Sequence, residues 1–169
     1  MISYFEQRLL GKDLRSIGRS DEVVRLVQDQ TDFDELFKLL LHHERLLVMR
    51  AADAIEKITA TRKQFLEPHK DQILILARSA MDKGLKWHIA QLISRIPLST
   101  PELKEVSDLL VYWAKNPNES KIVRVNALQG LYELSLQFPD LKDRLEDTIS
   151  ILEHEPIPSL KARIRKLRR

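Results

Sequence analysis

The chain of 169 residues contains no cysteine, only four glycines and seven prolines, and no long run of apolar residues. Without cysteine, disulfides, Cys-ligated zinc sites and cysteine nucleophiles are excluded. So few glycines and prolines argue against a turn-rich all-β fold, and the missing apolar run argues against a membrane span. Because the N-terminal residues also lack the features of a signal peptide, we expect a cytoplasmic protein.

The sequence also lacks the short motifs that carry most catalytic and metal chemistry. It has no glycine-rich phosphate loop, no Gly-x-Ser-x-Gly elbow and no His-Glu-x-x-His spacing. His42, His43 and Glu44 are three potential ligands in a row, but adjacent residues on a helix point in different directions and do not meet at one ion. We therefore expect no enzymatic activity, no cofactor and no metal.

What the sequence does contain is an apolar pattern that recurs every 38 residues. The first three sets have the spacing i, i+3, i+4, i+7, which forms one stripe along a helix, and in the fourth set Arg163 breaks the pattern at i+3. A repeat of this length is typical of stacked helical hairpins, because each hairpin buries its apolar face only against its neighbours. The sets are Ala51, Ala54, Ile55 and Ile58; Ile89, Leu92, Ile93 and Ile96; Ala127, Gly130, Leu131 and Leu134; and, after a shorter step, Leu160, Ile164 and Leu167.

Capping signals and prolines divide the chain into about ten helices. Thr31 is expected to cap the third helix, and Pro68 to lie in the first turn of an outer helix. Ser99 and Glu102 have the spacing of a capping box. Short helices are expected at 2–10 and 21–29, and inner helices at about 46–60, 85–96, 120–137 and from about 159 onward.

The inner helices resemble those of HEAT repeats, which read roughly Val-Arg-x-x-Ala-Ala-x-Ala-Leu-x-x-Leu. Residues 123–134 (VRVNALQGLYEL) match this pattern well, residues 47–58 (LVMRAADAIEKI) match its central part, and residues 85–96 diverge more. The resemblance implies an all-α fold, a right-handed α-solenoid of about four helical hairpins preceded by one or two N-terminal helices. It also implies a single domain over 1–169, with N-terminal helices in 1–30 and repeats in 31–169.

In this family the Arg of the Val-Arg pair often forms an ion pair with an Asp in the preceding turn, which builds a ladder between repeats. Arg124 with Asn118 is the pair in this sequence that resembles the family's pattern.

The resemblance also locates a binding surface, because the inner helices of a solenoid line its concave side. If the apolar stripes face the core, positions 50, 53 and 57 and their equivalents in the next two repeats face the groove. All nine residues are polar or charged, which favours recognition of a protein partner; the alternative is an ordinary solvated helix face. The predicted groove comprises Arg50, Asp53, Lys57, His88, Gln91, Arg95, Asn126, Gln129 and Glu133.

A second candidate surface is the basic C-terminal helix. The net charge of +3 comes from the last nine residues, which carry six positive charges and no negative one. Such a patch can bind nucleic-acid phosphates or an acidic protein surface. The alternative is an end cap, since terminal repeats need a polar outer face. The patch comprises Lys161, Arg163, Arg165, Lys166, Arg168 and Arg169.

The leading prediction is a non-enzymatic module that binds a protein partner through its concave groove. A nucleic-acid-binding solenoid ranks second. Resemblance to the HEAT-like alkylpurine DNA glycosylases is weak, because Asp53 has no aromatic companions on its row. In a third interpretation the chain is a subunit of a larger assembly, and Tyr4, Phe5, Leu9 and Leu10 pack on the first repeat or on another chain. We expect no membrane contact, and a monomer or an assembly subunit.

Overall fold

A computed structural model describes residues 4–10 and 20–168 of the chain. Every regular element in these residues is a helix, with ten α-helices and four short 3₁₀ helices. The α-helices are α1 (Tyr4–Leu9), α2 (Ser20–Leu26), α3 (Gln30–Lys38), α4 (Arg45–Thr59), α5 (Lys70–Ser79), α6 (Lys83–Leu92), α7 (Thr100–Lys115), α8 (Lys121–Gln137), α9 (Lys142–Leu152) and α10 (Pro158–Leu167). The all-helical fold is confirmed, whereas the handedness and the number of repeats stay predictions.

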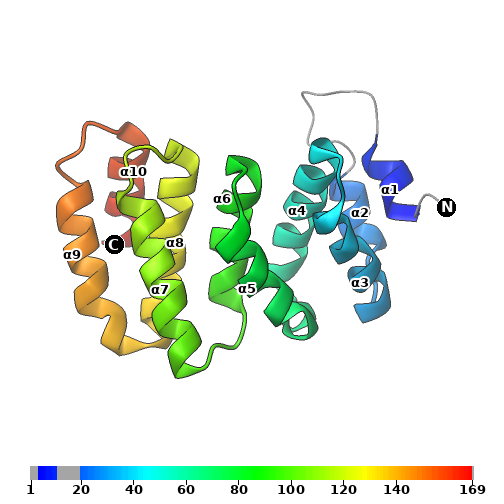
Figure 1. Cartoon of the computed structure of the whole chain (residues 1–169), viewed down its shortest axis with the longest axis horizontal. Helices are drawn as coiled ribbons and strands as arrows, with labels where there is room; N and C mark the ends of the chain where they lie inside the picture. The colour runs from blue at the N-terminus through cyan, green and yellow to red at the C-terminus, as the bar shows by residue number, and fades with distance from the viewer. Residues whose placement is uncertain (1–3, 11–19, 169) are drawn as a thin grey trace. The chain divides into compact units, whose positions relative to one another are not determined.

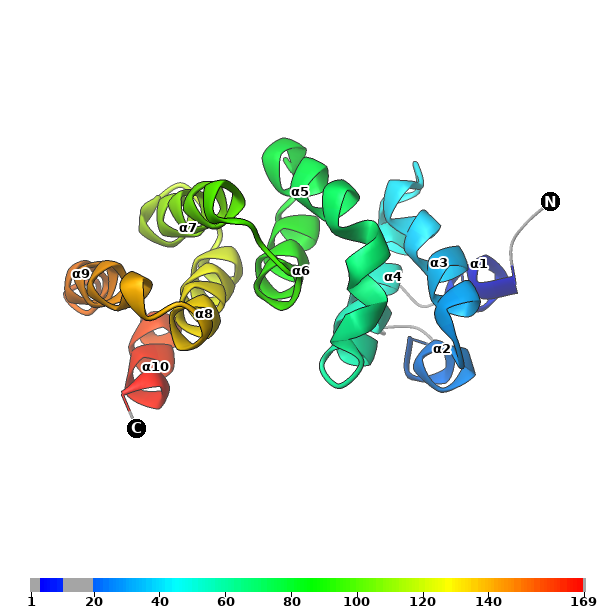
Figure 2. The same ribbon diagram turned by 90° about the horizontal axis from the view of Figure 1, so that it is seen from below.

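The helices form two compact units, Met1–His69 and Lys70–Arg169, which we call unit 1 and unit 2. In unit 2 the helices lie in two layers, with α5, α7 and α9 on one side and α6, α8 and α10 on the other (Figure 2). Helix α8 is central, because it packs against α6, α7, α9 and α10 (Figure 1). In unit 1, α4 packs against α1, α2 and α3. The single domain over 1–169 stays a prediction.

The periodic apolar positions form the cores of the units. All twelve positions of the first three sets are buried, as are Leu160 and Ile164 of the fourth, while Leu167 is half-buried. Leu47 and Val123, earlier on the same faces, are also fully buried. The stripe on each inner helix therefore faces inward, as the spacing predicts.

Gly130 allows the closest approach between two of these helices. A Cβ atom at this position would lie 2.4 Å from the carbonyl oxygen of Ala90, which belongs to α6. Backbone atoms cannot yield to such a contact as a flexible side chain can. Glycine here lets α6 and α8 pack backbone to backbone.

Two of the three expected helix starts are wrong. Asp29, not Thr31, caps α3, because its carboxylate accepts a hydrogen bond of 3.0 Å from the Asp32 amide. Pro68 lies inside a 3₁₀ segment, Lys63–His69, and α5 begins only at Lys70. At the third start, the backbone N–H and the hydroxyl of Ser99 both donate to Glu102 at 2.7 Å, which confirms the capping box.

Aromatic packing explains the 3₁₀ segment that contains Pro68. The Phe65 ring lies against Phe33, with centroids 5.3 Å apart, and the His69 ring stacks on Phe37 at 3.9 Å. His69 also contacts the Asp34 carboxylate through Nε2 at 2.7 Å. These contacts fix residues 65 and 69 against α3, so the chain turns at the surface of α3 before it starts α5.

Candidate functional site

The nine predicted groove residues lie on α4, on α8, and on α6 with the 3₁₀ turn that follows it, and none of them is fully exposed. Arg50, His88 and Asn126 are buried, with 3%, 1% and 9% of their surface accessible. The other six are half-buried. The row is therefore not a freely solvated helix face. Its hydrogen bonds differ between the two units.

In unit 1 the three groove residues of α4 hold the N-terminal helices. A guanidinium nitrogen of Arg50 donates to the backbone carbonyl of Leu9, at the end of α1. Asp53 accepts a hydrogen bond of 2.6 Å from the Ser20 hydroxyl, at the start of α2. Phe5 and Leu9 are buried, whereas Tyr4 is 53% and Leu10 41% exposed. Part of the N-terminal apolar set thus packs on the first repeat of the same chain.

Lys57 completes these contacts with two carboxylates. Its ammonium group lies 2.7 Å from Asp21 of α2 and 2.8 Å from Asp53 of α4. Burial alone would lower the pKa of Lys57, but the hydrogen bonds to Asp21 and Asp53 outweigh it and hold the pKa above its usual value. This side chain is therefore engaged within the chain.

In unit 2 two of the six groove residues, Gln129 and Glu133, form a hydrogen-bonded row with Ser94 and Arg163 that crosses from one inner helix to the next. The Glu133 carboxylate accepts from the Ser94 hydroxyl at 2.5 Å and from the Gln129 amide at 3.0 Å. The side-chain oxygen of Gln129 in turn accepts from Arg163 of α10 at 2.6 Å. The row thus has fixed side-chain orientations; Ser94 is buried, whereas Gln129, Glu133 and Arg163 stay half-buried.

The basic C-terminal patch is divided by these contacts. Arg163 joins the row through Gln129, and Arg168 pairs with Glu153 of α9 at 2.9 Å. Lys161, Arg165 and Lys166 are exposed on α10. Arg169 lies outside the described residues.

The predicted ladder partner of Arg124 is wrong. Arg124, with a side chain only 2% exposed, donates to both carboxylate oxygens of Glu155 at 2.8 and 2.5 Å. Its Nε also donates to the carbonyl of Ala114 at 2.8 Å. Glu155 lies in the turn after α9, so Arg124 pairs with the following turn and not with Asn118 of the preceding one.

Lys86 forms the same kind of pair one repeat earlier. It lies 38 residues before Arg124, and its ammonium group contacts Glu119 in the turn before α8. Both side chains are largely buried, 14% and 11% exposed. Unit 2 therefore has two rungs of a ladder, and both point toward the C-terminus.

A pocket that the sequence did not reveal opens between the starts of α8 and α10. It has a volume of about 430 Å³ and is lined by Lys121, Ile122, Val125, Asn126, Ser159 and Arg163. Only Asn126 and Arg163 belong to the predicted sites. The signal that could have revealed it is Ile122, an isoleucine outside the apolar stripe that is 47% exposed.

A smaller pocket of about 270 Å³ lies on unit 1 and is lined by Glu44, Arg45, Leu46 and Met49. Arg45, Leu46 and Met49 precede Lys121, Ile122 and Val125 by two repeat lengths, so related positions line both pockets. The pocket on unit 1 contains a carboxylate, which the pocket on α8 and α10 does not.

Comparison with known protein families agrees with the helix pairs and the buried stripes. A family model described as HEAT repeat domain matches residues 6–169. The chain belongs to the HEAT repeat domain family. Searches of curated proteins and of solved structures found no significant match. HEAT repeats generally mediate protein–protein interactions, and the match to this HEAT repeat chain includes most of α1 and all of α2.

Within residues 4–10 and 20–168, no helix has both the length and the apolar content needed to cross a bilayer. Over the same ranges, no group of three His, Asp or Glu side chains converges as the ligands of a metal ion would.

Proposed function

We propose that the chain is a non-enzymatic module that binds a partner protein on the inner-helix face of unit 2. This face comprises the half-buried Gln91, Arg95, Gln129 and Glu133, the buried His88 and Asn126, and the pocket between α8 and α10. The observation that carries the proposal is the hydrogen-bonded row from Ser94 through Glu133 and Gln129 to Arg163. Membership of a family whose repeats generally bind proteins supports it.

The row suits recognition because its side chains are ordered before a partner arrives. Ordering a long polar side chain on binding costs roughly 0.5–1.5 kcal/mol, and side chains already held by neighbours lose less. Amide and carboxylate groups that stay half-exposed can still bond to a partner's backbone. In unit 1, by contrast, Arg50, Asp53 and Lys57 contact α1 and α2. We therefore assign these three residues to holding the N-terminal helices.

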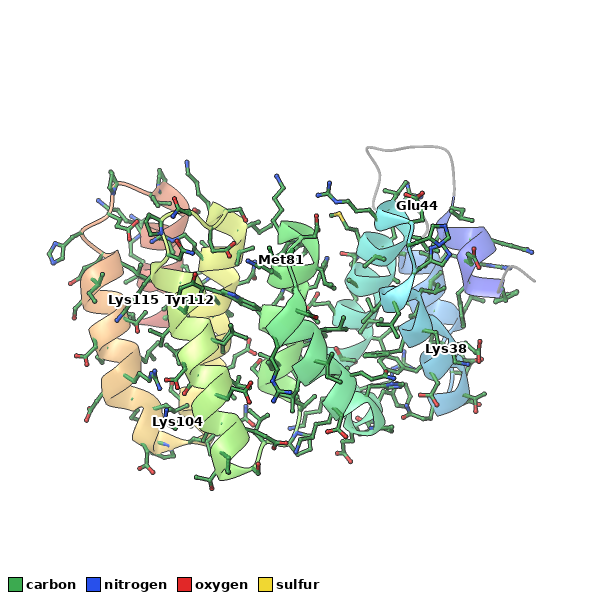
Figure 3. All side chains as sticks on the ribbon, in the orientation of Figure 1. Lys38, Glu44, Met81, Lys104, Tyr112 and Lys115 are labelled. Atoms are coloured by element: carbon green, nitrogen blue, oxygen red, sulfur yellow. The ribbon has the colours of Figure 1, made fainter. Side chains whose placement is uncertain are left out.

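Site-specific photo-crosslinking in a native lysate tests this function. A photoreactive amino acid replaces Gln91, which is half-buried on α6, and in a matched control it replaces Tyr112, which is 60% exposed on the outer helix α7 (Figure 3). We expect one protein to be captured from position 91, with or without nuclease, and not from position 112. The double variant Gln91→Ala/Gln129→Ala should then weaken that protein's affinity about tenfold.

Capture from position 112 alone, or unchanged affinity of the double variant, would exclude the inner-helix face as the binding surface. Capture that disappears after nuclease treatment would favour the second candidate, nucleic-acid binding by α10. The observation in favour of that candidate is the exposure of Lys161, Arg165 and Lys166 on one short helix. Binding to phosphate would weaken steeply as salt is raised. Cytoplasmic localisation and a monomeric or assembly-subunit state are part of the proposal and stay predictions.

A further inference from the structure

The pocket between α8 and α10 has two cationic residues and an aliphatic surface. Lys121 lies at the start of α8, and Arg163 lies on α10, one turn after Ser159. Ile122 and Val125 provide the aliphatic part. None of the six lining residues is acidic, so the positive charge of Lys121 and Arg163 has no counter-ion within the lining.

Arg163 is held in a fixed position at this pocket. One of its terminal nitrogens donates to the side-chain oxygen of Gln129 at 2.6 Å. A guanidinium carries five N–H donors, so this bond uses one of them and fixes the plane in which the others lie. A planar, oriented guanidinium matches the geometry of a carboxylate, which can accept two N–H bonds at once.

Lys121 is a basic residue in the first turn of α8, a position where helices usually favour acidic residues. The N-terminus of a helix carries partial positive charge, which favours acidic residues in the first turn and disfavours basic ones. Helix α8 has a neutral N-cap, Ser120, and no acidic residue in its first turn. An anion bound in the pocket would be attracted both by Lys121 and by the end of α8.

Asn126 adds a polar group to the wall of the pocket. It is 9% exposed, and its side-chain nitrogen donates to the carbonyl of Ile122 at 2.8 Å. The side-chain oxygen of an Asn is an acceptor, which suits a backbone N–H of a bound peptide. The pocket thus combines donors for an anion, an acceptor for an amide and an aliphatic surface.

We propose that this pocket binds an Asp or Glu side chain of an acidic segment of a partner protein, with a neighbouring apolar residue of that segment on Ile122 and Val125. The carboxylate lies between Lys121 and Arg163. The inference rests on the proposed function and adds the chemistry of the partner.

Charge and composition favour an acidic protein segment over nucleic acid. No aromatic side chain lines the pocket, so bases have no stacking surface there. Glu133, further along the same face of α8, would repel a continuous phosphate backbone. A short acidic segment needs to place only one carboxylate in the pocket, with an aliphatic residue beside it, and meets neither obstacle.

Fluorescence anisotropy with the full chain tests the proposal. The probes are a labelled peptide GSLEDLEGS, the same peptide with Gln and Asn in place of Glu and Asp, and a short single-stranded DNA. We expect the acidic peptide to bind saturably and the amide peptide to bind about tenfold more weakly, as expected for the loss of two partly exposed charge pairs. The methyl resonance of Ile122 should shift on addition of the acidic peptide alone.

Variants identify the residues responsible. Lys121→Ala/Arg163→Ala should weaken peptide binding about tenfold. Lys115→Ala/Lys142→Ala removes the same charge from α7, on which Lys115 is labelled in Figure 3, and from α9, and should leave binding unchanged. Because Arg163 also contacts Gln129, Arg163→Lys serves as a second variant: it keeps the charge but not the planar guanidinium, so it should bind the peptide more tightly than Arg163→Ala and less tightly than the unaltered chain.

Several results would overturn the inference: no saturable binding of the acidic peptide, equal binding of both peptides, tighter binding of the DNA, or equal losses in both double variants. These results are distinguishable from failure of the proposed function. If the captured partner crosslinks at position 91 but its affinity does not depend on Lys121 and Arg163, the inner-helix face remains the binding surface and only the acidic-segment inference fails.

Discussion

The buried ladder pair of Arg124 and Glu155 gives a sharp prediction of stability, because its two members differ in burial. The Arg124 side chain is 2% exposed and that of Glu155 is 28% exposed. Arginine stays charged at any ordinary pH, so it cannot avoid the cost of burying its charge by losing a proton. Removing Glu155 leaves a buried cation without its counter-ion, whereas removing Arg124 leaves a carboxylate that water can reach.

We expect Glu155→Ala to lower the free energy of unfolding by about 3 kcal/mol, the lower end of the range for breaking a buried pair by removing one partner. Arg124→Met, which keeps the length and bulk of the side chain, should cost only about 1 kcal/mol, because the main loss is the hydrogen bond to the carbonyl of Ala114. The double variant should resemble Arg124→Met within about 0.5 kcal/mol, since the two residues interact directly.

Urea unfolding monitored by tryptophan fluorescence measures these free energies of unfolding for unit 2. Both tryptophans, Trp87 and Trp113, lie in unit 2 with the ladder pair, so the signal reports on that unit. The reasoning is refuted if Arg124→Met is the more damaging single change, or if the two single costs add in the double variant. Either result would mean that water or another group compensates the buried guanidinium.

Two further predictions concern unit 2. Gly130→Ala should destabilise it by about 2 kcal/mol through overpacking, despite the better helix propensity of alanine, because the new Cβ would meet the Ala90 carbonyl at 2.4 Å; a urea midpoint equal to that of the unaltered chain would contradict the close approach. The hydrogen bonds from Lys70 and Ser99 lower the pKa of Glu102 to about 2 from 4.5, so the stabilisation by Glu102 is complete above about pH 4.5 and is lost as the pH falls toward 2. The free energies of unfolding of the unaltered chain and of Glu102→Gln, plotted against pH, should therefore converge in acid. Curves that stay parallel down to pH 2 would exclude a stabilising contribution from the Glu102 carboxylate.

The sequence predicted the positions of the inner helices well, because their signal is local. Four apolar residues at helical spacing have one way to bury themselves together, and the burial of Ala51, Ile89 and Ala127 follows from it. Helix starts were harder to predict. Asp29 and Thr31 are both acceptable N-caps by residue type, and the 3₁₀ segment around Pro68 depends on contacts of Phe65 and His69 with α3.

The polar contacts were predicted least well, because a long side chain can reach several possible partners, all of them far from it in the sequence. Arg124 was recognised as a ladder position and Lys86 was not, and their partners Glu155 and Glu119 lie 31 and 33 residues away. Nothing in the local sequence separates these carboxylates from others nearby. The pocket escaped prediction for the same reason, because its walls come from two helices.

By itself the sequence determined that the chain is all-helical, that the apolar faces of its inner helices are buried, and that it belongs to a repeat family. The reason is that the apolar spacing lies within each helix separately. Only the tertiary structure decided how the polar residues are used. Arg50, predicted to face the groove, donates a hydrogen bond to the carbonyl of Leu9, and Arg163, predicted to belong to the basic patch, donates one to Gln129 at a pocket. The physical reason is that burial depends on a residue's own helix, whereas a hydrogen bond depends on which other helix is packed beside it.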